Sequence, residues 1–427
     1  MKTIAFKTLG CRLNQYETDA LASTFQNNDY KLVDFETEAD IYVINSCTVT
    51  HQSDHKSRNF ISQANRRNKD SVLVVTGCMA NNAKEELENR DEINYVLEND
   101  NKSALFSLVE AHFKGELKHP SQLDKDLFAY GATEKGFHTR SMIKIQDGCD
   151  NFCTFCIIPS VRGRAKSRPF QAILDNVKAV IDQGAKEVVI TGVNIGRYEF
   201  ETYRFDDLVE AILNLDGDFR LRISSLEPDG FGDKFLSLLS HPKMTPHLHL
   251  CLQSGSDSVL LRMRRMYTIK TFKETVDKVR AIRPDFNFTT DIIIGFPGES
   301  ETDFTESCDM IKSLRFGHVH AFKYSIRKGT RAERMPDQVP EKLKTERSEI
   351  LRGIANDSKL QYRNTFIGST QRVLVESING NLAKGYGEHY IPVQFEAENL
   401  KKNTFYDVRI NEINPEKDGL LIGSLLK

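Results

Sequence analysis

The chain of 427 residues lacks the features of a membrane or secreted protein. Its mean hydropathy is -0.44, and no apolar run approaches the roughly 20 residues that a membrane-spanning helix needs. The opening MKTIAFKTLGC is typical of a short strand, without the apolar core and cleavage site of a signal peptide. We therefore expect a cytoplasmic protein without a membrane segment. In that reducing compartment, clustered cysteines bind metal more often than they form disulfides.

The chain also lacks a strong excess of either charge. Its formal net charge of -2 gives no global signature of nucleic-acid binding, so any RNA contact must come from local charge. Lys and Arg gather in three runs, at residues 56–69, 162–168 and 262–273. A single such run usually forms a solvated helix face. Cations beside a reactive site also suit a polyanionic substrate whose backbone must be held.

Six of the eight cysteines form two triplets, and the tighter one has the spacing C-x3-C-x2-C. Its members are Cys149, Cys153 and Cys156 in QDGCDNFCTFCIIPSVRG. Three thiolates can bind three irons of a cubane iron–sulfur cluster and leave the fourth iron open. Zinc sites more often pair cysteines two by two or include histidine, and no histidine lies within this triplet. The spacing favours a cluster, with zinc or unligated cysteines as the alternatives.

The second triplet follows three apolar segments near the start of the chain. TIAFKTLGC ends at Cys11, DIYVINSC at Cys47 and SVLVVTGC at Cys78, and helical patterns lie between them. This alternation predicts a small parallel α/β sheet over residues 1–115, whose ligands bind beyond the carboxyl ends of the strands. One cysteine there would be an ordinary buried residue. Three equivalent cysteines predict a second three-thiolate cluster.

A strand-then-helix pattern repeats six times over residues 141–330 and predicts a partial (β/α)6 barrel. The active site of such a barrel lies at the carboxyl ends of its strands. Polar side chains on that rim suit a zwitterionic ligand with a nucleoside, although each alone could be a helix cap or turn residue. The candidates are Asn194, Arg222, Ser225, Glu227, Gln253 and Asp291.

The remaining segments complete the predicted organisation. Residues 116–140 are polar and rich in glycine and form a linker. Residues 331–367 form a charged helical connector with an apolar face. Short alternating runs over residues 368–427 predict a small antiparallel β-barrel, similar to an OB fold. Its aromatic residues could stack RNA bases, yet in a small barrel most aromatics belong to the core.

The tight triplet, with Phe155 directly before its last cysteine, and the barrel behind it resemble the radical S-adenosylmethionine (SAM) superfamily. The N-terminal triplet and the segments TGVNIGRY, RISSLEP, LQSGSD, IIIGFPGE and YSIRKGT narrow the resemblance to the methylthiotransferases. It covers essentially the whole chain. The motif GCRLN is similar to the GCKVN of the branch that acts on N6-threonylcarbamoyladenosine in tRNA. The isopentenyladenosine branch usually has GCQMN, and the ribosomal-protein branch has GCPKN.

This resemblance implies two [4Fe–4S] clusters with separate roles. Cys149, Cys153 and Cys156 would bind the cluster that chelates SAM and cleaves it to a 5′-deoxyadenosyl radical. Cys11, Cys47 and Cys78 would bind an auxiliary cluster that carries the sulfur. The radical would remove hydrogen from C2 of adenine 37, beside the anticodon, and a methylthio group would replace it. No side-chain acid or base is needed, since the cofactors supply the difficult step.

The resemblance also suggests contacts and partners. Asn194, Ser225, Glu227 and Gln253 would contact SAM, with Asp291 a further candidate. Arg222 would either hold the methionine carboxylate or pair with Glu227. The partners would be the tRNA anticodon loop, bound in part by a C-terminal TRAM domain, and an unidentified electron donor.

Three alternatives follow from the same residues. The first is action on isopentenyladenosine-37 of tRNA, and the second is action on a ribosomal-protein aspartate. The third is a non-catalytic RNA-binding protein that zinc stabilises.

Overall fold

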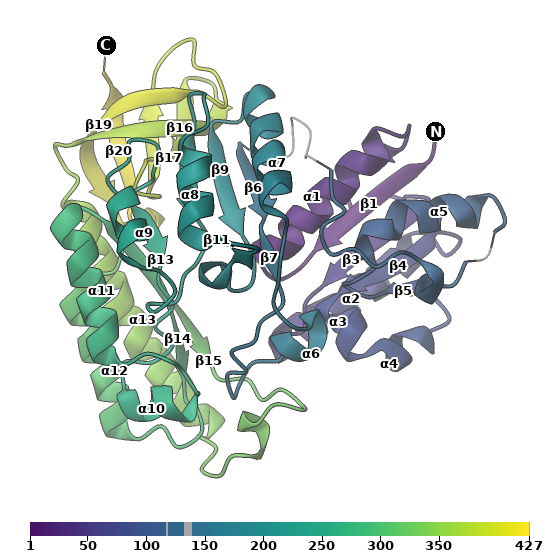
Figure 1. The fold of residues 1–427 in the computed structure, drawn as a ribbon, viewed down its shortest axis with the longest axis horizontal. Helices are drawn as coiled ribbons and strands as arrows, with labels where there is room; N and C mark the ends of the chain where they lie inside the picture. Colours follow the sequence, from purple (N-terminus) through teal and green to yellow (C-terminus); the bar gives the residue numbers. More distant parts are fainter. Residues whose placement is uncertain (117, 132–138, 427) are drawn as a thin grey trace.

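The computed structural model describes residues 1–116, 118–131 and 139–426 and contains two α/β regions and a small β-barrel (Figure 1). The N-terminal region has a five-stranded parallel sheet in the order β2-β1-β3-β4-β5. Its strands are β1 (Thr3–Thr8), β2 (Lys31–Leu32), β3 (Ile41–Ser46), β4 (Val72–Gly77) and β5 (Tyr95–Leu97). Its helices are α1 (Arg12–Gln26), α2 (His51–Arg67), α3 (Cys78–Asn82), α4 (Lys84–Glu88) and α5 (Leu105–Phe113). The predicted parallel α/β region is confirmed.

Helices cover both faces of this sheet, which explains its continuous apolar strands. Every residue of β3 and β4 is buried. Val72 and Val74 pack with α1 and α5, whereas Leu73 and Val75 pack with α2, α3 and α4. The alternation along one strand therefore supplies two separate cores.

The central region is the predicted partial barrel. Its parallel strands form two three-stranded sheets, joined through bridges that link β12 and the chain after it to the chain around β13. The strands are β6 (Arg140–Lys144), β9 (Glu187–Thr191), β12 (Arg220–Ile223), β13 (His247–His249), β14 (Asn287–Ile294) and β15 (His318–Lys323). The outer helices are α7 (Phe170–Asp182), α8 (Phe205–Leu213), α9 (Asp233–Leu238), α10 (Asp257–Arg262), α11 (Ile269–Ile282) and α12 (Glu301–Leu314).

Alternation along the barrel strands separates an apolar outside from a polar inside. Leu221 and Ile223 of β12 belong to the main core, whereas Arg220 and Arg222 do not. Two short strands, β7 (Gln146–Asp147) and β8 (Lys166–Ser167), and α6 (Ile158–Arg162) follow β6 around the tight cysteine triplet.

A long helix, α13 (Glu341–Asn364), leads to the C-terminal barrel. This barrel closes in the order β16-β17-β18-β20-β19 and confirms the predicted small β-barrel, with β18 and β20 as a parallel pair. Its strands are β16 (Thr370–Asn379), β17 (Leu382–Tyr386), β18 (Pro392–Glu396), β19 (Phe405–Asn414) and β20 (Leu420–Leu425). Part of the linker predicted at 116–140, namely residues 117 and 132–138, lies outside the described residues.

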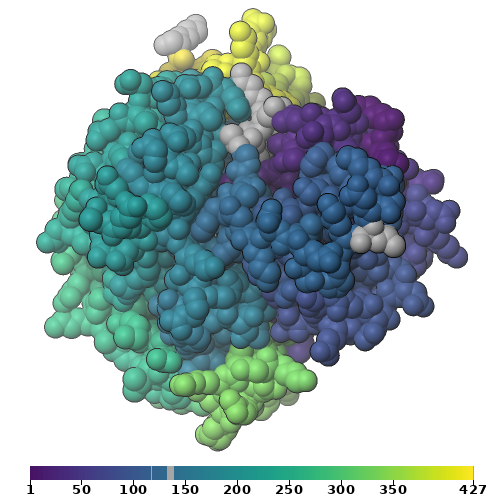
Figure 2. All heavy atoms as spheres, turned by 45° about the vertical axis from the view of Figure 1, so that its right-hand side comes forward, coloured from purple at the N-terminus to yellow at the C-terminus, as the bar shows by residue number. Residues whose placement is uncertain are grey.

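The N-terminal region packs directly against the partial barrel, and the chain after β15 (light green) lies below both in Figure 2. Arg327 of that segment donates to Asp54 at 2.6 Å and to the carbonyl of Thr48 at 2.8 Å. These bonds join the N-terminal region to the chain that follows β15, the last strand of the partial barrel. Among the described residues, no helix is long and apolar enough to span a membrane.

Candidate active site

The structure brings Cys11, Cys47 and Cys78 together at the carboxyl edge of the N-terminal sheet. Cys11 precedes α1, Cys47 follows β3, and Cys78 begins α3. Burial raises the pKa of the Cys78 thiol to about 11, and the neighbouring Cys11 and Cys47 add to this effect. All three are free cysteines. Three thiols held this close together suit a metal group, because a metal ion binds the thiolate form and displaces the thiol proton.

Two glycines allow this close approach. Gly10 has a φ of +94°, and a Cβ there would lie 2.9 Å from Cys47 Sγ. Gly77 has a φ of +93°, and a Cβ there would lie 2.3 Å from the carbonyl oxygen of Ser46. Only glycine meets both demands, since a positive φ and the missing side chain are needed together.

The tight triplet lies in the loop after β7. Burial raises the pKa of Cys156 to about 12, and Cys153 and Cys149 contribute to the increase. These cysteines are free and partly buried. Three converging thiols with no histidine suit an iron–sulfur cluster with one open iron.

A buried arginine connects this triplet to the predicted rim. Arg265 donates from Nη1 to Cys153 Sγ at 3.1 Å, and its Nη2 lies 2.7 Å from Glu227 Oε1. Glu227 also accepts from Asn151 at 2.6 Å and from Asn194 at 3.5 Å. The rim residues Asn194 and Glu227 therefore lie beside the cysteines.

Gln253, Asp291 and Ser225 occupy the neighbouring part of the barrel. The backbone N–H of Gln253, which has a φ of +66°, donates to the carbonyl of Asp291 at 2.8 Å. The Asp291 carboxylate lies 3.3 Å from His249 Nε2. Ser225 follows β12 and is partly buried.

His249 and Asp291 form an ion pair, and His320 lies beside them. Suitable ligand atoms of these three residues lie within 4.8 Å of one another. Burial favours the neutral imidazole, but the hydrogen bonds and charge interactions with Asp291 and Cys251 together outweigh it and raise the pKa of His249 to about 10. A protonated imidazole does not ligate metal, so we interpret this group as an ion pair.

Arg222 lies apart from the other rim candidates. It is fully buried, and its Nε donates to Glu187 Oε1 at 2.6 Å rather than to Glu227. Glu187 begins β9, so the Arg222 side chain extends toward the amino ends of the strands. Of the two roles predicted for Arg222, the pairing with Glu227 is wrong. Strand pairing sets Arg222 opposite Val189, two residues after Glu187, and its side chain reaches back to the Glu187 carboxylate.

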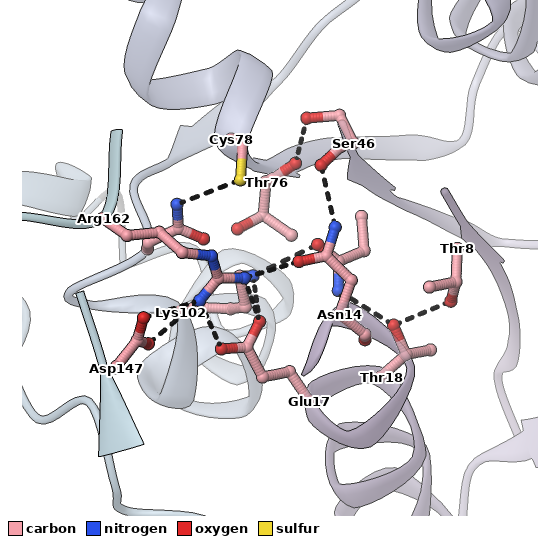
Figure 3. A network of polar contacts seen from close by, with 12 residues as sticks. Thr8, Asn14, Glu17, Thr18, Ser46, Thr76, Cys78, Lys102, Asp147 and Arg162 are labelled. Atoms are coloured by element: carbon pink, nitrogen blue, oxygen red, sulfur yellow. Dashed lines mark hydrogen bonds and ion pairs between the residues drawn. The ribbon is translucent and has the colours of Figure 1, made fainter. Parts of the chain in front are cut away.

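A buried charge network joins the two cysteine regions (Figure 3). Glu17 of α1 accepts from Lys102 at 2.5 Å, from Lys144 at 2.8 Å and from Arg162 at 3.1 Å. Asp147 lies 2.6 Å from the Lys144 ammonium and 2.9 Å from Arg162. All five side chains are at most 1% exposed.

The network carries three cations against two carboxylates, and Arg162 and Lys102 both lower the pKa of Cys78 against its burial. A surplus positive charge beside the first triplet suits an anionic thiolate-bound group. Arg162 therefore cannot reach an RNA backbone from inside the protein, whereas Arg164 of the same basic run has a side chain that is 70% exposed. Arg265 of the third run is buried like Arg162, with a side chain only 6% exposed.

Sequence reasoning did not assign Glu17, Lys102, Lys144 or Asp147 to the site, and it noted Arg265 only as part of a basic run. The available signal was a charged residue inside an otherwise apolar strand, as with Lys144 in MIKIQD. Isolated charges are rarely fully buried unless they are paired. The pairing itself arises between segments far apart in the chain.

Comparison with known families matches both α/β regions. The model described as "Uncharacterized protein family UPF0004" matches residues 3–98, and the radical SAM superfamily matches residues 143–311. TsrM from Kitasatospora setae, a radical SAM methyltransferase, has a similar fold, with a TM-score of 0.56 at 14% identity over 75% of each chain.

Curated relatives extend the similarity to nearly the full length. The threonylcarbamoyladenosine tRNA methylthiotransferase MtaB of Thermotoga maritima is 35% identical, over 97% of this chain and 96% of its own. MtaB of Bacillus subtilis is 36% identical over 92% and 90%. The tRNA-2-methylthio-N(6)-dimethylallyladenosine synthase of Syntrophus aciditrophicus is 32% identical over 90% and 86%. The chain therefore belongs to the methylthiotransferases of the radical SAM superfamily.

Proposed function

We propose that the protein places a methylthio group on C2 of N6-threonylcarbamoyladenosine at position 37 of tRNA. The observation that carries this proposal is the pair of three-cysteine sites on adjoining regions that a buried charge network joins. MtaB relatives support the threonylcarbamoyladenosine branch at 35% and 36% identity, whereas the dimethylallyladenosine synthase is 32% identical.

The enzyme uses SAM and two [4Fe–4S] clusters. Cys149, Cys153 and Cys156 would hold the cluster that binds SAM, and Cys11, Cys47 and Cys78 the auxiliary cluster. When bound, these groups supply the radical chemistry and the sulfur atom. A C–H bond of adenine offers no acidic proton for a side chain to remove, so we assign no residue the role of a catalytic acid or base.

The protein residues position and shield the reacting groups. We propose that Asn194, Ser225, Glu227 and Gln253, with Asp291, contact SAM, because they lie on the barrel wall beside the tight triplet. Arg265 would hold both Glu227 and Cys153 through its guanidinium. Fixed polar groups of this kind orient a ligand without reorganising during reaction.

We also propose a cytoplasmic location and a low-potential one-electron donor as partner. All eight cysteines are free, which agrees with a reducing compartment. The donor must deliver electrons singly, because radical cleavage of SAM consumes one electron.

The test is anaerobic reconstitution of the wild type and of a Cys11→Ala, Cys47→Ala, Cys78→Ala triple variant. We expect about eight irons in the wild type and about four in the variant. Nucleoside mass spectrometry of treated tRNA should show the methylthio product only with the wild type, while the variant still forms 5′-deoxyadenosine.

Cys308→Ala is the matched control, since Cys308 is buried in α12 and far in sequence from both triplets. It should retain eight irons and the product. Four irons in the wild type would contradict the two-cluster proposal. Methylthiolation of isopentenyladenosine or of a ribosomal protein, with threonylcarbamoyladenosine left unchanged, would contradict the substrate assignment.

A further inference from the structure

An arginine-lined cavity lies at the amino ends of the partial-barrel strands, where α1 and the C-terminal barrel meet them. Its volume is about 260 Å³, and its wall includes Arg12, Arg140, Met142, Val189 and Arg222, together with Glu376 of β16. Arg12 directly follows the cluster ligand Cys11, so the cavity adjoins the auxiliary site. β6 and β12, which carry Met142 and Arg222, run from this cavity toward the tight triplet and the rim.

The charges around this cavity do not balance among the described residues. Arg220 and Arg222 share the carboxylate of Glu187, each at 2.6 Å. Arg140 pairs with Glu376, and Arg12 has no acidic partner among the ion pairs of the described chain. Four guanidinium groups therefore meet two carboxylates.

The guanidinium of Arg222 is only partly satisfied, since within the described chain its Nε alone donates a hydrogen bond. Nη1 and Nη2 of Arg222 are fully buried and have no hydrogen-bond partner among the described residues. Arg222 packs over the ring of Tyr390 at 4.0 Å. The Tyr390 hydroxyl accepts from Arg12 at 3.2 Å and from Arg140 at 3.0 Å. Buried arginine donors without partners are costly, and a carboxylate satisfies two of them at once.

We propose that Arg12 and Arg222 bind the carboxylate of the N6-threonylcarbamoyl group, which makes them specificity-determining residues. The inference rests on the proposed function. An adenine whose C2 faces the two cluster sites would carry its N6 substituent toward the amino ends of the barrel strands, where this cavity offers cations. The dimethylallyl group has no carboxylate, so these arginines would favour the threonylcarbamoyl substrate.

The methionine carboxylate of SAM is the other source of this chemistry. It is expected beside the tight triplet, at the carboxyl ends of the strands, whereas Arg222 extends toward their amino ends. The experiment therefore measures SAM binding separately.

The probes are two anticodon stem-loops, one with N6-threonylcarbamoyladenosine and one with the methyl ester of the same nucleoside. For the wild-type holoenzyme, we expect a KM about tenfold or more lower for the acid, as for the loss of a charged hydrogen bond. Arg12→Gln should remove most of that preference by raising KM for the acid alone. Arg352→Gln, on the exposed face of α13, should retain it.

Arg222→Met should act like Arg12→Gln, with its thermal unfolding measured to verify folding. Arg12 is exposed, so its variant keeps the test valid if Arg222→Met fails to fold. Iron content and the Kd for SAM should stay at wild-type values in both variants.

An unchanged acid-to-ester preference in Arg12→Gln would overturn the inference and leave the proposed function intact. An equal loss for both probes would show a contact to the RNA backbone instead, and weaker SAM binding would show a SAM site. Failure of the wild type to modify the acid stem-loop and tRNA would refute the proposed function itself.

Discussion

Glu17→Gln is the substitution that most directly tests the buried network between the two α/β regions. Both oxygens of Glu17 accept hydrogen bonds, from Lys102, Lys144 and Arg162, at 2.5 to 3.2 Å. Glutamine keeps the shape but removes the charge, and its amide N–H would face a cation. Removing one partner of a buried ion pair costs about 3–5 kcal/mol. We expect a loss of that size in the stability of the N-terminal region.

The assay is urea unfolding with hydrogen exchange followed at the amides of α1. Glu36→Gln is the matched control, because Glu36 pairs with Arg67 on the surface with a side chain 63% exposed. Such surface pairs contribute about 0–1 kcal/mol. A loss below about 1 kcal/mol in Glu17→Gln, equal to that of the control, would refute the reasoning.

The pH dependence supplies a second check on Glu17. Burial raises the pKa of this carboxyl, but Arg162, Lys102 and Lys144 outweigh it and hold the pKa well below its usual value. A lowered pKa contributes stability that is present above about pH 4.5 and is lost as the pH falls. The stability difference between wild type and Glu17→Gln should therefore narrow on acidification below pH 4.5, and a constant difference would contradict this account.

Three further outcomes are expected. Arg265→Gln removes the cation beside the tight triplet, so the reduction potential of the cluster there should become more negative in an EPR redox titration. An unchanged potential would contradict this electrostatic role of Arg265. Asp291→Asn should lower the pKa of His249 from about 10, measured by NMR titration, because it removes one of the two residues, Asp291 and Cys251, that favour the charged imidazole. The pair stabilises the fold fully below about pH 6.5 and loses this effect as the pH rises through 10, and a retained pKa near 10 would exclude the pair. Gly77→Ala should halve the iron content, because the new Cβ would displace the auxiliary ligands. Gly353→Ala is the control, since a Cβ there meets nothing within 4 Å, and it should keep all of the iron. Equal iron in the two variants would refute the steric argument.

The sequence predicted most of the local structure and the two groups of cysteines that the structure brings together. Cysteines after apolar strands are recognisable without tertiary information, because parallel strands end at one edge of a sheet. The six barrel strands were found in the same way, from apolar segments that alternate with amphipathic helices. The pattern could not place side chains that point into the barrel, where polar residues break the apolar runs.

The C-terminal aromatics illustrate this limit. Tyr386 and Tyr390 stack on each other, with ring centroids 4.9 Å apart, and contact Arg140 of the central barrel. These two tyrosines therefore lie at the interface between the C-terminal barrel and the central region. The sequence had suggested only two roles for such aromatics, RNA base stacking and core packing. Residues on separate domains meet only after both have folded, and no local pattern records that contact.

By itself, the sequence determined the family, the two cysteine triplets and the order of the folded regions, because these depend on local spacing and periodicity. Only the tertiary structure decided which charges are buried together. The buried network brings together four separate segments, which carry Glu17, Lys102, Lys144 and Arg162. Arg222 likewise pairs with Glu187 and not with Glu227. Burial makes such pairing obligatory, since an isolated charge inside a protein is too costly, but the choice of partner depends on which strands and helices become neighbours.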